Sequence, residues 1–64
     1  MLTPHEARQR LNHNRMSMRW CNDRREYRIN YNERDQEHTA YYTDDLLDAA
    51  LMGGKMRRNA TAYA

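Results

Sequence analysis

With 64 residues and a mass of 7.8 kDa, the chain has room for one small domain and none for a multidomain enzyme. Leu, Ile, Val and Phe together number only six, a share typical of disordered chains, but the net charge of +2 is too small for that class. No apolar run approaches the roughly 18 residues of a membrane span, and no heptad pattern predicts a coiled coil.

A short helix is predicted at the start of the chain. Thr3 is placed to be its N-cap, Pro4 suits the first helical position, and Glu6 completes a capping box by reaching back to the cap amide. The apolar face is thin, because Leu11 is its one large residue. The Asn-His-Asn run at 12–14 lowers helix propensity, so we expect the helix to end there.

Three stretches with the alternating pattern of half-buried strands follow. Residues 16–21 and 26–31 alternate between apolar and polar side chains, and residues 38–42 form a shorter third stretch. The polar segments 22–25 and 32–36 suit turns, so we predict an antiparallel meander. One face of this sheet would carry an apolar set: Met16, Met18, Trp20, Tyr27, Ile29, Tyr31, Ala40 and Tyr42.

The C-terminal helix has the clearest signal. Thr43 is predicted as its N-cap, followed by Asp44 and Asp45, whose negative charge would meet the positive end of the helix dipole. Tyr42 and Leu47 have the spacing of a hydrophobic staple across the start of the helix. At helical spacing, the predicted buried face consists of Leu47, Ala50, Leu51 and Gly54.

The end of this helix is left open by Gly53 and Gly54. Either this pair is the C-cap, or Ala50 and Gly54, small residues one turn apart, allow close packing on the sheet and the helix runs to about Arg58. The order helix, strand, strand, strand, helix predicts an α+β fold in which the C-terminal helix packs on one sheet face. We expect one domain over residues 1–58 and a flexible C-terminal tail over 59–64.

Charge is segregated along the chain. Residues 1–31 carry a net charge of +4, residues 32–52 carry −5, and residues 53–64 carry +3. One explanation is a set of solvated turns together with acids at the start and bases at the end of a helix. The other is a surface with opposed basic and acidic regions, which would orient a partner during encounter.

Nothing in the sequence indicates catalysis. It contains no Ser-His-Asp pattern, no nucleophile elbow and no phosphate-binding glycine loop. The three histidines and Cys21 lack the short ligand spacings of zinc sites, and a chain of this size leaves little room for a substrate pocket. We therefore expect a non-enzymatic protein with no metal, no other cofactor and no small-molecule substrate.

The compartment is predicted from the same composition. A single cysteine, Cys21, excludes an internal disulfide and favours a reducing interior, where it is expected to be an unremarkable strand-end residue. The first residues lack the basic and apolar blocks of a signal peptide, so we expect a cytoplasmic protein without membrane contact.

Nucleic-acid binding is one of two binding hypotheses. Its candidate residues lie on the outward face of the predicted sheet and in the adjoining turn: Arg19, Arg24, Arg25, Arg28, Asn30 and Tyr41. Guanidinium groups contact phosphates, asparagine reads adenine, and tyrosine stacks on unpaired bases. The predicted order over residues 15–57, a three-stranded sheet followed by a helix, resembles the small integrase N-terminal and plant AP2-type DNA-binding domains, which implies nucleic-acid binding. The acidic segment 32–52 would repel phosphates wherever it is close.

A protein-interaction or regulatory module is the favoured hypothesis. Arginine and aromatic residues are the composition of interface hot spots. A thin core also invites completion by another chain, either a different protein or a second copy in a homodimer. The third strand is a candidate sheet edge for such pairing.

Overall fold

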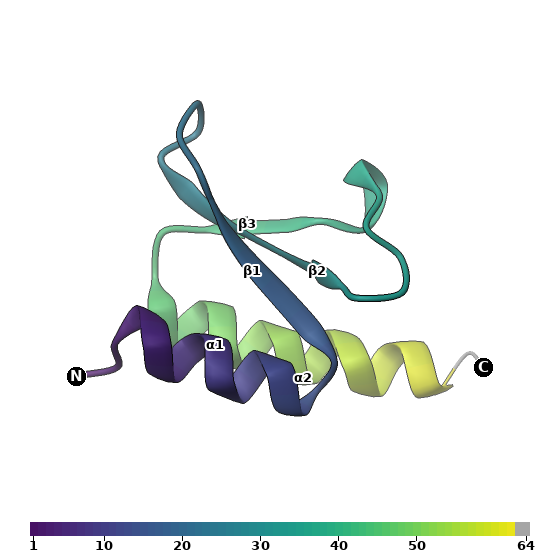
Figure 1. Cartoon of the computed structure of the whole chain (residues 1–64). Helices are drawn as coiled ribbons and strands as arrows, with labels where there is room; N and C mark the ends of the chain where they lie inside the picture. Colours follow the sequence, from purple (N-terminus) through teal and green to yellow (C-terminus); the bar gives the residue numbers. More distant parts are fainter. Residues whose placement is uncertain (63–64) are drawn as a thin grey trace.

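Two helices and a three-stranded sheet form two layers (Figure 1), and the predicted α+β fold is confirmed. The computed structural model describes residues 1–62. The elements are α1 (Pro4–His13), β1 (Met16–Cys21), β2 (Glu26–Tyr31), the 3-10 helix η1 (Glu37–Thr39), β3 (Tyr41–Thr43) and α2 (Leu46–Ala62). The sheet order is β1-β2-β3, and both strand pairs are antiparallel, as the meander requires.

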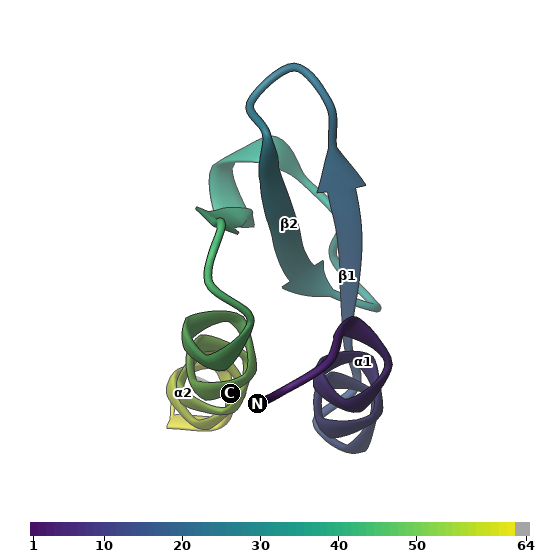
Figure 2. The same cartoon turned by 90° about the vertical axis from the view of Figure 1, so that its left-hand side faces the viewer.

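The start of α1 follows its sequence signal. Thr3 Oγ1 accepts a hydrogen bond from the Glu6 amide at 3.2 Å, and Glu6 Oε1 accepts one from the Thr3 amide at 3.2 Å, so the capping box is confirmed. Ala7 and Leu11 are fully buried. Both helices lie on the same side of the sheet, next to each other and running in the same direction (Figures 1 and 2).

The core lies between the helices and the inner sheet face. Its buried members are Ala7, Leu11, Met16, Met18, Ile29 and Ala49. Met18 pairs with Ile29 across β1 and β2, and Ile29 pairs with Tyr41 across β2 and β3. The core is therefore built largely from methionine and tyrosine side chains, because the chain has few branched aliphatic residues.

The predicted orientation of the third strand is wrong. We expected Ala40 and Tyr42 on the inner face, but Tyr41 lies opposite Ile29 and packs against the core, while Tyr42 lies opposite Arg28 on the outer face. The 3-10 turn of η1 takes up the first residues of the expected strand, so β3 starts only at Tyr41. Because side chains alternate along a strand, a shift of one residue exchanges its faces.

The predicted start of α2 is also displaced. Asp45, not Thr43, caps the helix: Asp45 Oδ1 accepts from the Leu47 amide at 2.9 Å and from the Asp48 amide at 3.4 Å. Thr43 Oγ1 instead accepts from the Asp45 amide at 3.2 Å. The hydrophobic staple is not formed, because Tyr42 lies on the outer sheet face and Leu47 is exposed.

The buried face of α2 differs from the expected one as well. Leu47 is 51% exposed and Leu51 is 63% exposed, whereas Ala49, Ala50 and Gly53 are buried. The reason is the position of α1 beside α2. The small residues let the two helices approach closely, and Leu11 of α1 fills the space over Gly53.

The helix continues through Gly53 and Gly54 to Ala62, past Arg58. Of the two alternatives, the longer helix is the one observed. The closest approach is at Gly53 against Leu11 of α1, and not at Gly54 against the sheet. Residues 59–62 are helical. The predicted flexibility of the tail stays a prediction, and residues 63–64 lie outside the described residues. No helix within residues 1–62 is long and apolar enough to span a membrane.

The orientation of α2 leads to a simple mutational prediction. Leu47→Asp is expected to leave the fold intact with an almost unchanged melting temperature, because the side chain is half exposed and a carboxylate suits the first helical turn. Ala49→Asp is the matched variant on the buried face and is expected to unfold the protein. Thermal unfolding followed by circular dichroism measures both, and loss of the helical signal in Leu47→Asp would contradict the orientation.

Candidate interaction surfaces

The outer sheet face, formed by Arg19, Glu26, Arg28, Asn30 and Tyr42 with Ser17 and Cys21, points away from the helices. The loop of residues 32–40 folds back over this face and is held there by Asn30, which is 1% exposed. Asn30 Nδ2 donates to the Gln36 carbonyl at 2.8 Å and to Asp35 Oδ1 at 3.2 Å, while its Oδ1 accepts from Thr39 Oγ1 at 2.8 Å. Asn30 therefore positions the loop and is not presented to a ligand.

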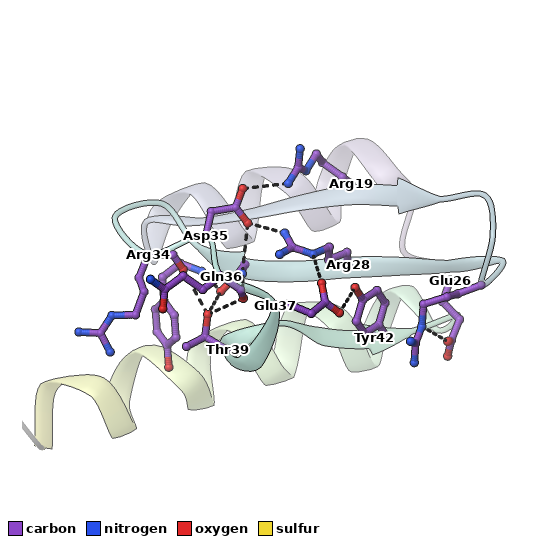
Figure 3. A network of polar contacts seen from close by, with 12 residues as sticks. Arg19, Glu26, Arg28, Arg34, Asp35, Gln36, Glu37, Thr39 and Tyr42 are labelled. Atoms are coloured by element: carbon purple, nitrogen blue, oxygen red, sulfur yellow. Dashed lines mark hydrogen bonds and ion pairs between the residues drawn. The ribbon is translucent and has the colours of Figure 1, made fainter.

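Arg19 and Arg28 share one carboxylate of that loop. Arg19 Nη2 lies 2.8 Å from Asp35 Oδ2, Arg28 Nη1 bonds to Asp35 Oδ1, and Arg28 Nε lies 3.7 Å from Glu37 Oε2 (Figure 3). The two arginines are directly opposite each other in the register, so their like charges would repel without this acid. The hydrogen bond from Arg28 lowers the pKa of Asp35, so the carboxylate stays charged.

Arg24 and Arg25 lie in the turn between β1 and β2. The Arg24 guanidinium stacks over the Tyr42 ring at 3.8 Å and lies 3.6 Å from Glu26 Oε1. The Tyr42 hydroxyl donates to Glu37 Oε1 at 2.6 Å, which raises the pKa of Tyr42. Arg25 is exposed and has a left-handed backbone with φ of 54°.

Tyr41 does not lie with the other candidates. It is on the inner face, where its hydroxyl donates to Asp48 Oδ2 at 2.7 Å, a bond that raises the pKa of Tyr41. The structure thus brings Arg19, Arg28 and Asn30 together under an acidic loop and separates Tyr41 from them. The charge segregation along the chain is the sequence feature that reflects this pairing, because Asp35 of the acidic segment is the ion-pair partner of Arg19 and Arg28 of the basic segment.

A second surface is the hairpin end, defined as residues 20–27, of which only Arg24 and Arg25 were predicted as binding residues. Figures 1 and 2 show that the turn joining β1 to β2 stands well clear of both helices. Trp20, expected in the core, is 49% exposed there. Its ring is 5.0 Å from that of Tyr27 in an edge-on arrangement, and its indole N–H donates to Asn22 Oδ1 at 3.2 Å.

A third surface is the outward side of α2, where Leu47 and Leu51 are exposed. Beside its first turn lies an open hollow of about 550 Å³, lined by Met1, Leu2, Asp44, Asp45, Leu46 and Leu47. Asp45 is occupied as the helix N-cap, and the lining contains no histidine, cysteine, serine or lysine. Within residues 1–62, no three His, Cys, Asp or Glu side chains are grouped so that they could hold a metal ion.

Comparison with known proteins adds no functional assignment. No family model matches the chain, and searches of curated proteins and of solved structures return no significant match.

Proposed function

We propose that this protein is a non-enzymatic binding module of the interaction or regulatory kind, and that it contacts a partner protein through the hairpin end. The observation that carries the proposal is the half-exposed Trp20 on a hairpin that extends beyond the helix layer. Tryptophan, tyrosine and arginine are the residues most often found at interface hot spots, and the hairpin end holds all three.

The geometry of Trp20 suits recognition. The edge-on contact with Tyr27 and the hydrogen bond to Asn22 hold the indole in one orientation before a partner arrives. A side chain that is already ordered loses less conformational entropy on binding. Burying the rest of an exposed indole in a partner's apolar pocket also removes a large apolar area from water.

The nucleic-acid alternative receives less support. Arg19 and Arg28 are paired with Asp35, and Arg28 also faces Glu37, so a phosphate would have to compete with carboxylates held on the same face. Asn30 is buried under the loop, and Tyr41 is on the other side of the sheet. The candidate residues do not form one basic, accessible surface.

The proposal is tested by affinity capture with the immobilised full chain, followed by quantitative mass spectrometry. Trp20→Ala is expected to reduce recovery of specific partner proteins at least tenfold, because loss of a hot-spot residue costs about 2 kcal/mol or more. Leu51→Ala, an exposed apolar side chain on a different surface, is the matched control and should recover them unchanged.

Two results would overturn the proposal. One is an identical set of captured proteins with Trp20→Ala and with the unmodified chain. The other is tight binding of labelled duplex or single-stranded nucleic acid that weakens steeply between two salt concentrations and does not depend on Trp20, since this dependence is the signature of phosphate contacts.

A further inference from the structure

We propose that the outward side of α2 binds a second copy of the chain, as a symmetric antiparallel helix pair centred on Leu51. The α2 stripe is defined as Leu47, Leu51, Lys55 and Arg58, with Asp44 just before the helix. The inference goes beyond the proposed function, because it concerns a different surface from the hairpin end and names its occupant.

The first observation is the apolar character of the stripe. In α2 the small residues Ala49, Ala50 and Gly53 face the rest of the protein, while Leu47 and Leu51 face solvent. A surface helix normally directs its large apolar residues inward. The two leucines are one helical turn apart, so they form a continuous apolar strip along the outside of the helix.

The second observation is charge complementarity. Asp44 and Arg58 are each seven residues from Leu51, and Leu47 and Lys55 are each four residues from it. All four are exposed. Arg58 lies about 10 Å from Leu51 along the helix axis, because the rise is about 1.5 Å per residue. Asp44 lies two residues before α2 begins, at the opposite end of the helix.

An antiparallel pair with its two-fold axis at Leu51 places each Leu47 beside the aliphatic stem of Lys55 of the second copy. It also brings the acidic N-terminal end of each α2, where Asp44 lies, toward the basic C-terminal part of the other helix, where Arg58 lies. A parallel pair would instead place acids beside acids and bases beside bases, which is unfavourable. The same residues thus favour a second copy of the chain as the partner and an antiparallel orientation of the two helices.

The contact involves one face of one helix, so the dimer is expected to be weak and concentration-dependent. Sedimentation velocity over a series from micromolar to millimolar chain should show the mass rising from one chain toward two. Leu51→Glu should remain monomeric throughout the series. Asn12→Glu, an exposed change of the same charge on α1, is the matched control and should dimerise like the unmodified chain.

The antiparallel orientation of the two α2 helices is tested by charge reversal. Arg58→Glu and Asp44→Lys should each weaken the dimer at least about tenfold, because each places like charges at both ends of the pair. The double variant Asp44→Lys with Arg58→Glu should recover the original affinity, since opposite charges again face each other. A parallel pair would gain nothing from the double change, so failure of this recovery overturns the antiparallel arrangement.

Dimerisation is overturned if the unmodified chain stays monomeric at millimolar concentration, or if Leu51→Glu dimerises as well as the unmodified chain. Circular dichroism confirms that each variant is folded, as expected for exposed positions. The result is separable from the proposed function: Trp20→Ala should dimerise normally, and Leu51→Glu should still capture the partner of the hairpin end.

Discussion

Replacing Arg57 by methionine is expected to lower the free energy of unfolding by about 3 kcal/mol, measured by urea denaturation. Only 15% of the Arg57 side chain is exposed. Its Nε donates to the Asn14 carbonyl at 2.8 Å and its Nη2 to the Arg15 carbonyl at 2.8 Å, at the C-terminal end of α1. The substitution would leave these carbonyls without their charged donor.

The same guanidinium also ties down the loop that covers the outer sheet face. Arg57 Nη1 donates to Glu33 Oε2 at 2.7 Å and Nη2 to Glu33 Oε1 at 2.9 Å, and the guanidinium lies 5.2 Å from the centre of the Tyr31 ring. One side chain of α2 thus joins α1, the sheet and the loop. The core of so small a domain rarely supplies more than about 3–5 kcal/mol, so the contacts of Arg57 are comparable in size with the contribution of the whole core.

Two further variants make the Arg57 prediction specific. Arg57→Lys keeps the charge but not the planar fork, and it is expected to recover only part of the loss. Arg8→Met changes an exposed arginine of α1 in the same way and should be nearly neutral. Equal stability of Arg57→Met and Arg8→Met would show that the guanidinium does not hold these elements together.

Acid titration measures how much the ion pair between Glu33 and Arg57 contributes to stability. The hydrogen bonds from Arg57 lower the pKa of Glu33 from 4.5 to about 2. Because the pKa is lower in the folded state, the stabilisation is complete above pH 4.5 and is lost as the pH falls toward 2. In Glu33→Gln this part of the acid destabilisation should be missing, so the stability difference from the unmodified chain should shrink over that interval.

The second large effect is expected at Gly53. Gly53→Ala should lower the free energy of unfolding by about 1–2 kcal/mol, because overpacking outweighs the gain in helix propensity. A Cβ at this position would overlap Leu11 Cδ2 and lie 3.8 Å from Met16 Cγ. Leu11 and Met16 are themselves fully buried and have little space into which to move.

The neighbouring glycine is the matched control. At Gly54 a Cβ would meet Arg58 Nη1 at 3.5 Å and Asn14 Nδ2 at 3.8 Å, which are ordinary contacts. Gly54→Ala is therefore expected to stabilise the helix by about 0.5–1 kcal/mol. Thermal or urea unfolding of both variants measures the difference, and the close approach of α1 and α2 is contradicted if both changes are stabilising. In Gly53→Ala, the additional change Leu11→Ala should cost less than it does alone.

Local patterns were sufficient for the number and type of the two helices and three strands. The capping box at Thr3 and Glu6 involves neighbours in the chain, and the alternation in residues 16–21 and 26–31 reports a strand wherever the sheet is formed. The order of elements, and hence the α+β fold, followed from these short-range signals. The charge segregation also pointed to a real feature, since Asp35 and Glu33 of the acidic segment pair with distant arginines.

Local patterns did not predict which faces of β3 and α2 are buried. Tyr41 and Tyr42 are the same residue type, so only pairing with β2 decides which one enters the core. α2 carries Leu47 and Leu51 on one side and small residues on another, and hydrophobic spacing alone selects these leucines. The close neighbour α1 reverses that choice, because Leu11 needs the space over Gly53.

For the candidate surfaces, too, the sequence determines the residue types and the tertiary structure determines their exposure and pairing. The residue types of an interaction protein, Trp20 among arginines and tyrosines, are a property of the sequence. Tertiary structure alone decides that Arg19 and Arg28 pair with Asp35, that Trp20 is half exposed, and that Leu51 faces outward. The physical reason is range: hydrogen bonds and periodicity act between near neighbours, whereas exposure and ion pairing depend on segments that meet only after folding.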